Sequence, residues 1–211
     1  MIDLEPGQDC TLCPRLAAFR EENRKKFHNF FNAPVPCFGS RDAKLLIVGL
    51  APGLQGANRT GRPFTGDYAG DLLYATLLKH GLAAGAYDRD PGDGLTLVGC
   101  RIVNAVRCVP PQNKPTPAEI GTCNTFLRAE IAAMGNLKAL LALGAIAHGA
   151  VLTALSERKS KHAFAHNVSH NLTSGLVLVD SYHCSRYNTN TGVLTTEMFE
   201  MAVITAKSAA A

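Results

Sequence analysis

Long hydrophobic runs are missing from this sequence of 211 residues. No apolar run approaches the ~18 residues of a membrane-spanning helix, so a transmembrane protein is not expected. The first ten residues, MIDLEPGQDC, lack a basic segment followed by an apolar one. That absence argues against a secretory signal and predicts a cytoplasmic protein. The chain also has no internal repeat, no low-complexity segment and no GxSxG motif, and the last absence argues against a serine hydrolase built on Ser181 or Ser185 with His183.

The sequence has little excess charge of either sign. Its 21 lysines and arginines against 17 acidic residues give a net charge of +4, which permits an anionic partner such as nucleic acid without requiring one. Apolar residues make up 46% and charged residues 18%, an ordinary globular composition. The length and composition predict one domain over residues 1–211 with a full core.

The hydrophobic pattern predicts an α/β fold. Continuously apolar segments favour strands at 44–50, within 95–108, at 137–144 and at 176–183. Helical spacing and end signals favour helices at 14–27, 69–81, 116–134, 145–155 and 195–210. Residues 156–175, which contain His162, His166 and His170, are expected to form an exposed polar loop rather than a metal-binding face. Apolar strands that alternate with helices predict a mostly parallel sheet covered on both faces.

Three polar segments follow predicted strands. They are GLAPGLQGANRTGRPFTGD (49–67), NAVRC (104–108) and HCSRYNTNTG (183–192). In open α/β sheets, ligands bind beyond the carboxyl ends of the strands. We therefore expect these segments to build one binding site.

Seven cysteines are many for a cytoplasmic chain, where disulfides are rare. Cys10 and Cys13 form a CxxC pair, and Cys108 and Cys123 lie far along the chain. Four thiolates suit either zinc or a [4Fe–4S] cluster, and the spacing leaves both open. The alternative is that these are buried core thiols.

The other three cysteines have weaker signals. Cys100 lies within an apolar strand and is expected in the core, while Cys37 has no evident role. Cys184 follows His183, but adjacent residues on an extended segment point to opposite sides. A Cys–His nucleophile is therefore poorly placed here.

An ordered set of motifs resembles the family 5 (type B) uracil-DNA glycosylases, the iron–sulfur branch of their superfamily. These motifs are CTLCPRL, PVPCFG, LLIVGLAPG, GANRTGRPFTGD, NAVRCVPPQNKPTPAEIGTC and SYHCSRYNTNTG. The resemblance implies a three-layer α/β/α sandwich around a four-stranded, mostly parallel sheet. It also implies a [4Fe–4S] cluster on Cys10, Cys13, Cys108 and Cys123 that ties in the N-terminal segment.

The implied activity is base excision repair. The resemblance implies a monofunctional glycosylase that flips uracil, and also hypoxanthine or xanthine, out of double- or single-stranded DNA and leaves an abasic site. We expect a nucleoid-associated monomer of bacterial or archaeal type, with no membrane partner. The rival hypothesis is an iron–sulfur DNA-binding member of the family whose catalysis is impaired.

The resemblance also assigns roles in the base pocket. Phe64 stacks on the base, Asn104 binds its edge, and His183 donates to a base oxygen as the base leaves as an anion. Ala51 stands where related glycosylases carry a polar residue, so Asp67 becomes the candidate for positioning water. The structural alternatives are a core phenylalanine for Phe64, a strand-end turn for Asn104, a helix N-cap for Asp67 and a structural histidine for His183.

Further residues complete the expected site. The base-binding set also includes Gly49, Ala51, Pro52 and Gly53, whose small or backbone groups allow close approach. The DNA-binding set comprises Arg59, Arg62, Ser185, Arg186, Tyr187, Asn188 and Thr189.

The sequence departs from the family pattern at three positions. Cys184 replaces a proline, Tyr187 a glutamine and Cys37 a glycine. Loss of the proline is expected to loosen the backbone beside His183.

Overall fold

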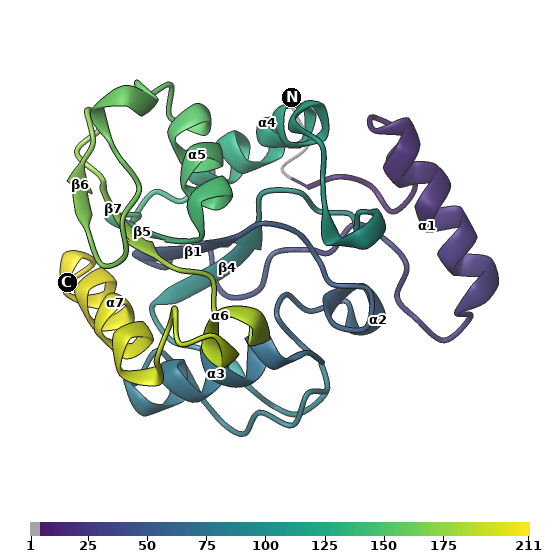
Figure 1. Ribbon diagram of the computed structural model, residues 1–211, viewed down its shortest axis with the longest axis horizontal. Helices are drawn as coiled ribbons and strands as arrows, with labels where there is room; N and C mark the ends of the chain where they lie inside the picture. The colour runs from purple at the N-terminus through teal and green to yellow at the C-terminus, as the bar shows by residue number, and fades with distance from the viewer. Residues whose placement is uncertain (1–4) are drawn as a thin grey trace.

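The computed structural model describes residues 5–211, and its centre is a five-stranded sheet in the order β4-β1-β5-β7-β6 (Figure 1). The strands are β1 (Leu45–Gly49), β4 (Cys100–Asn104), β5 (Ala139–Leu143), β6 (Ser169–Asn171) and β7 (Val177–Ser181). All neighbours are parallel except β6, which is antiparallel to β7. The prediction of a mostly parallel sheet is confirmed, with five strands instead of four. The predicted domain of residues 1–211 also includes residues 1–4, which lie outside the described part of the chain.

Helices cover both faces of the sheet, as the continuous apolar strands predict. In β1, Leu45 and Ile47 pack with α3 (Tyr68–Lys79) and α7 (Thr196–Ala209) in one core cluster. Leu46 and Val48 point the other way, into a second cluster with α4 (Pro117–Ala133) and α5 (Ala145–Ala154). Figure 1 shows the two helix pairs on opposite sides of the sheet, which makes a three-layer sandwich.

The remaining elements are short, except for α1. Helix α1 (Pro14–Lys26) stands at one end of the molecule, beside the sandwich (Figure 1). The short elements are α2 (Ala57–Thr60), β2 (Ala83–Ala84), β3 (Thr96–Leu97), η1 (Pro111–Asn113), η2 (Lys159–Lys161) and α6 (Arg186–Asn190). Strands β2 and β3 form a separate antiparallel pair. Within residues 5–211, no helix is both long and apolar enough to span a bilayer.

The predicted capping box at the start of α4 is present and also holds α1. The Thr116 side chain accepts from the Glu119 backbone N–H, and Glu119 accepts from the Thr116 backbone N–H. Arg15 of α1 donates to both carboxylate oxygens of Glu119, at 2.8 and 2.7 Å. One carboxylate therefore caps α4 and fixes the segment that follows the CxxC pair.

The prediction that residues 156–175 form an exposed loop is only partly right, because most of these residues are exposed but Ser169–Asn171 form a strand. This segment contains β6, and its His170 donates from Nε2 to the buried Asp180 carboxylate at 2.9 Å. His148 of α5 contacts the other Asp180 oxygen through Nδ1 at 2.7 Å and the His162 carbonyl through Nε2 at 2.9 Å. The histidines therefore anchor the segment to the sheet.

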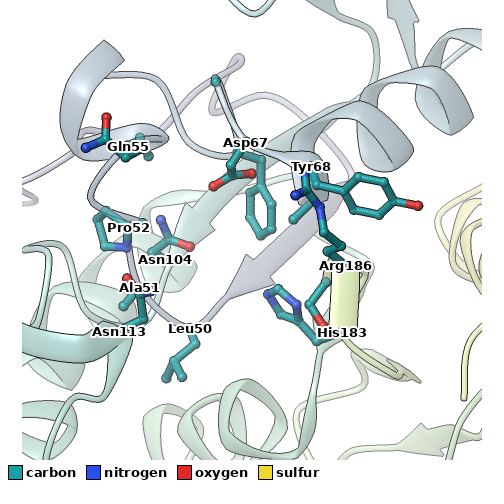
Figure 2. A pocket seen from close by; sticks show the side chains of 16 residues that line it. Leu50, Ala51, Pro52, Gln55, Asp67, Tyr68, Asn104, Asn113, His183 and Arg186 are labelled. Atoms are coloured by element: carbon teal, nitrogen blue, oxygen red, sulfur yellow. The ribbon is translucent and has the colours of Figure 1, made fainter. Parts of the chain in front are cut away.

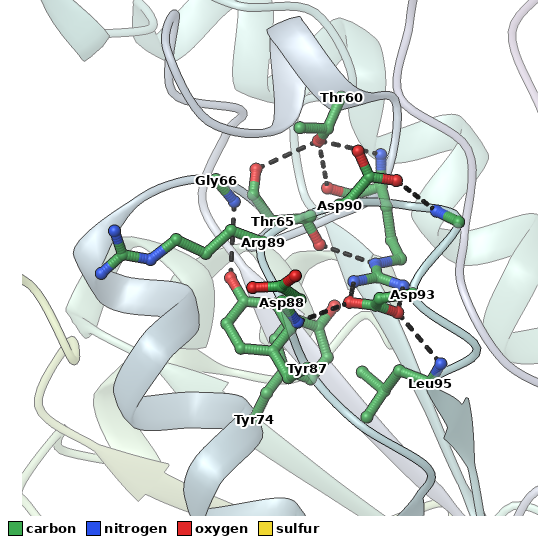
Figure 3. Close-up of polar contacts among 12 residues, drawn as sticks. Thr60, Thr65, Gly66, Tyr74, Tyr87, Asp88, Arg89, Asp90, Asp93 and Leu95 are labelled. Carbon is green, nitrogen blue, oxygen red and sulfur yellow. Dashed lines mark hydrogen bonds and ion pairs between the residues drawn. The ribbon is translucent and has the colours of Figure 1, made fainter.

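Arg62 is also placed differently from the prediction, which expected a phosphate contact. Its guanidinium is buried and donates to both carboxylate oxygens of Asp93, the residue labelled in Figure 3, at 2.8 and 2.7 Å. The rings of Phe38, Tyr74 and Tyr87 surround it at 5.3–5.8 Å from the ring centres. Arg62 is thus a structural residue that fastens the 85–95 loop, and its assignment as a DNA-binding residue is wrong.

This ion pair generates a stability prediction. Arg62 lowers the pKa of Asp93, so the pair stabilises the fold fully above the ordinary aspartate pKa of about 3.9, and this contribution is lost as pH falls below that value. Asp93→Asn should reduce the free energy of unfolding at pH 7 by about 3–5 kcal/mol, because it leaves a buried guanidinium unpaired. The loss should shrink as the pH is lowered toward 3.

The matched control is the exposed Asp90→Asn, expected to change stability by less than about 0.5 kcal/mol. Chemical unfolding followed by circular dichroism at several pH values measures both variants. Equal losses for the two variants would contradict the structural role of the pair.

Candidate active site

A cavity of about 620 Å³ opens at the carboxyl edge of the sheet (Figure 2). Three segments meet there: the 49–67 stretch after β1, Asn104 at the end of β4, and His183 after β7. Parallel strands bring their carboxyl ends to one edge, so these segments converge from distant parts of the chain. The expectation of one shared cavity agrees with this geometry.

Gly49 lies behind the cavity wall, and its missing side chain sets the wall's shape. A Cβ on Gly49 would lie 2.4 Å from Asn104 Oδ1 and 2.5 Å from Phe64 Cζ. Both distances are far below van der Waals contact, so only glycine allows the two side chains to sit over the strand end. Ala51, Pro52 and Gly53 line the cavity itself.

Phe64 supplies a flat apolar wall. Its ring is buried, and its centre lies 6.2 Å from the His183 ring at an interplanar angle of 31°. The backbone is left-handed, with φ of 53°, an uncommon conformation for a bulky residue. Gly70 accommodates it, because a Cβ there would lie 1.7 Å from the Phe64 carbonyl oxygen. Phe64 belongs to the main core cluster and also faces the cavity, so the core and stacking interpretations are compatible.

Asn104 contributes an unpaired polar atom. The residue is 3% exposed, and its Oδ1 has no hydrogen-bond partner among the described residues. A buried acceptor without a donor costs about 1–3 kcal/mol. Because the side chain lines the cavity, a ligand with an N–H or O–H group at this point would remove that cost.

Asp67 is the N-cap of α3, as the structural alternative expects. Its Oδ1 accepts from the Gly70 N–H at 3.2 Å. Its Oδ2 faces the 53–56 turn, where a Cβ on Gly56 would lie only 2.2 Å away. Burial raises the pKa of Asp67, and the nearby His183 partly offsets that increase. One oxygen thus caps the helix, and the residue also lines the cavity.

His183 is half-buried and faces the cavity in Figure 2. Burial lowers its pKa below the ordinary 6.5, although the Asp67 carboxylate works in the opposite direction. The imidazole is therefore neutral at pH 7 and can donate through one N–H.

The backbone beside His183 is firmly held, contrary to the expected loosening. Asn188 Nδ2 donates to the His183 carbonyl at 2.8 Å. Cys184 is fully buried, packs in the main core cluster, and directs its Sγ toward the Ala69 carbonyl at 3.5 Å. Burial raises the thiol pKa, which leaves no reactive thiolate and agrees with the rejection of a Cys184–His183 nucleophile.

The expected DNA-contacting loop is the short helix α6. Ser185 is its N-cap, accepting from the Asn188 N–H, and the Thr189 hydroxyl bonds within the helix. Arg186 lies over the Tyr68 ring at 5.4 Å, beside the cavity, and Tyr187 is 74% exposed. The outer surface of this helix is free to meet a partner.

Arg59 and three residues absent from the predicted site lie nearby. The side chain of Arg59 is exposed and donates to the Gln55 carbonyl. Gln55, Tyr68 and Asn113 line the cavity. Gln55 and Tyr68 are sequence neighbours of predicted motif residues, which is only a weak indication that they belong to the site. Asn113 has a left-handed φ of 57° in the turn η1, and its approach to the cavity depends on chain folding that no local pattern reveals.

The four cysteines singled out by the sequence line one apolar hollow. Cys10, Cys13, Cys108 and Cys123 converge there, with Leu16, Val106 and Phe126 around them. The Arg107 backbone N–H donates to Cys123 Sγ at 3.4 Å. In residues 5–211, no three of the four sulfur atoms come within 4.8 Å of one another, whereas a single tetrahedral zinc requires sulfurs about 3.8 Å apart.

The chain is similar to a well-defined group of proteins. The sequence model described as the Uracil DNA glycosylase superfamily matches residues 36–207. The type-5 uracil-DNA glycosylase of Thermus thermophilus is 45% identical over 203 residues, which cover 94% of this chain and 92% of the relative. The type-5 enzymes of Mycobacterium bovis and Pyrobaculum aerophilum are 43% and 38% identical; each match covers 90% of this chain, and 74% and 84% of the respective relatives.

Burial and the Asp67 carboxylate shift the pKa of His183 in opposite directions, and both shifts can be measured. In the wild type, the imidazole should titrate below its ordinary pKa, because burial disfavours the charged form. Asp67→Asn should lower the His183 pKa further, since it removes the one carboxylate that favours the imidazolium. NMR titration of the histidine ring signals tests both shifts, with Asp71→Asn as control because Asp67 is the carboxylate that acts on His183. A His183 pKa at or above the ordinary value would contradict this electrostatic account.

Proposed function

This chain belongs to the uracil DNA glycosylase superfamily and to its type-5 branch, and from that premise we propose that it removes uracil from DNA. The reaction is hydrolysis of the N-glycosidic bond, which leaves an abasic site. Among the described residues that line the cavity there is no lysine, so no side-chain amine is available there for a lyase step. A monofunctional glycosylase fits this composition.

The observation that carries the proposal is the single cavity that joins Phe64, Asp67, Asn104 and His183. A base inside a duplex is out of reach, so the nucleotide must rotate out of the stack into such a cavity. The volume of about 620 Å³ lies within the range of small-molecule sites and leaves room for a nucleobase with its sugar.

We propose that the side chains of Phe64 and Asn104 bind the base. Both can lie over the end of β1 because Gly49 has no side chain. The Phe64 ring stacks on the planar base. Asn104 Oδ1, which lacks a donor, accepts from an N–H on the base edge, and uracil N3–H supplies one. In the empty site, Asn104 Oδ1 is buried without a hydrogen-bond donor, which is unfavourable. Uracil binding supplies the donor and removes that cost, so the hydrogen bond favours binding.

Bond cleavage uses Asp67 and His183. As the glycosidic bond breaks, its electron pair leaves with the base and the sugar carbon becomes positive. A neutral His183 donates its N–H to a base carbonyl oxygen and stabilises the departing anion. The Asp67 carboxylate offsets the charge on the sugar and orients the water that attacks it. Ala51 lines the cavity but has no polar side chain, which leaves this duty to Asp67.

Contacts with the rest of the DNA would come from α6 and its surroundings. We propose that Arg186, which lines the cavity, and the exposed Tyr187 enter the groove beside the extruded nucleotide. Arg59 is the exposed cation of the 49–67 stretch and a candidate phosphate contact. The net charge of +4 is compatible with DNA in either double- or single-stranded form. We propose that the protein acts as a monomer on chromosomal DNA.

We propose hypoxanthine and xanthine as further substrates. An apolar Ala51 and small Gly53 leave the wall beside the base free of side chains that would exclude a purine. The fixed features, Phe64 and Asn104, recognise a planar ring with an N–H on its edge, which these bases share with uracil.

We propose a [4Fe–4S] cluster on Cys10, Cys13, Cys108 and Cys123. The donor set is four soft sulfur ligands in an apolar hollow, which suits such a cluster. When bound, the cluster would join the start of α1 to the segment after β4 and to α4. We assign it a structural role.

Loss of the pocket side chains should slow excision strongly without unfolding the chain. Asn104→Ala and His183→Ala should each reduce single-turnover excision of uracil by roughly 10²–10³-fold, because each removes a hydrogen bond that forms with the departing base. Alkali cleavage of a labelled uracil-containing oligonucleotide measures the abasic product. The control is Gly135→Ala, where an added Cβ meets nothing within 4 Å.

Parallel assays of abasic product, DNA binding and ester hydrolysis on the wild type distinguish the rival functions. DNA binding by the wild type without abasic product would indicate an impaired family member, and ester turnover would indicate a serine hydrolase. Wild-type rates from either pocket variant would contradict the residue assignments.

The cluster is tested by anaerobic purification. The wild type should carry about four irons per chain and absorb broadly near ~400 nm. Cys108→Ser should lose most of this absorbance, because it removes one ligand. The matched control is Cys100→Ala, which alters a buried core thiol remote from the hollow and should keep the iron. Stoichiometric zinc in place of iron would contradict the proposed cluster.

A further inference from the structure

Arg20 is a buried cation on a helix with little apolar surface. The inner face of α1 buries Leu16, Arg20 and Asn23, and Arg20 is only 3% exposed. A long charged side chain is rarely buried so completely unless it is paired. The burial of Arg20 therefore calls for a negative partner.

The described residues supply no adequate carboxylate for this cation. The nearest is Glu21, whose oxygen lies 3.8 Å from Arg20 Nε and whose side chain is 53% exposed. Arg20 Nη2 donates to the Cys10 carbonyl at 3.0 Å, which is a neutral partner. Arg20 Nε is buried and makes no hydrogen bond. An unpaired guanidinium in this position would cost several kcal/mol.

The remaining contact points to the cysteine hollow. Arg20 Nη1 approaches Cys108 Sγ at 3.9 Å, the range of a hydrogen bond to sulfur. Four neutral thiols would leave the cation uncompensated, whereas metal-bound thiolates carry the negative charge that it lacks.

We propose that Arg20 is the charge-balancing residue of the cluster site, donating to Cys108 and neutralising the anionic group that the four cysteines hold. This inference depends on the [4Fe–4S] cluster proposed above. Hydrogen bonds and charges around the sulfurs set the reduction potential of such clusters. A fixed positive charge stabilises the more reduced state, so Arg20 raises the potential.

The test compares the full-length wild type with Arg20→Lys, Arg20→Gln and Asn23→Ala, all purified anaerobically. Arg20→Lys keeps the charge, Arg20→Gln removes it, and Asn23→Ala disturbs the same buried face of α1 without changing charge. Voltammetry of the protein on an electrode gives the midpoint potential, and transfer of iron to a chelator gives the rate of cluster loss.

Arg20→Gln should shift the potential to a more negative value and release iron roughly tenfold or more faster, as expected for loss of a charge-assisted hydrogen bond. Arg20→Lys should restore most of both properties, and Asn23→Ala should keep the wild-type potential. If Arg20→Gln retains no cluster while the other two variants do, the requirement for charge is equally supported.

Two results would overturn the proposal. One is a wild-type potential and iron-release rate in Arg20→Gln. The other is equal cluster loss in Arg20→Lys, Arg20→Gln and Asn23→Ala, which would reduce Arg20 to a packing residue of α1. A wild-type protein without iron would instead remove the cluster itself, a failure that the iron content separates from the other two.

Discussion

The contact of Asn104 and Phe64 over Gly49 is the constraint on which the site depends. Gly49 and Asn104 are partners in the parallel ladder between β1 and β4, so the end of each strand fixes the position of the other. The bare backbone of Gly49 leaves room for the amide and the ring together. Phe64 can turn back over the strand only because its left-handed backbone fits against Gly70. Sheet pairing, rather than loop flexibility, thereby shapes the wall of the pocket.

Two of the seven buried side-chain polar atoms that lack partners among the described residues lie at the proposed ligand sites. Asn104 lines the cavity and its Oδ1 lacks a donor, while Arg20, which approaches Cys108 Sγ through Nη1, has an Nε that lacks an acceptor. Such groups are rare in native proteins and costly. Each has the polarity that its proposed ligand would complement: an N–H on a base for the first, and an anionic cluster for the second.

Local patterns predicted the elements with strong local signals. The apolar run at 44–50 identified β1, and Thr116 with Glu119 identified the start of α4. Arg62 shows the limit of this approach, because its pairing with Asp93 joins residues 31 positions apart. His148, His170 and Asp180 show the same limit, since three unremarkable polar residues become one buried network only after the sheet has formed. Cys184 stands where the family pattern has a proline, so the motif did not predict its role. Its burial explains how the backbone beside His183 stays fixed without that proline.

The most direct test of the pocket is a crystal structure of the protein bound to DNA that carries a uracil nucleotide with a non-hydrolysable glycosidic bond. The account predicts an extruded uracil stacked on Phe64, its N3–H within hydrogen-bond distance of Asn104 Oδ1 and a carbonyl oxygen facing His183. A uracil that remains in the duplex, or that binds elsewhere while protein side chains fill the cavity, would contradict it.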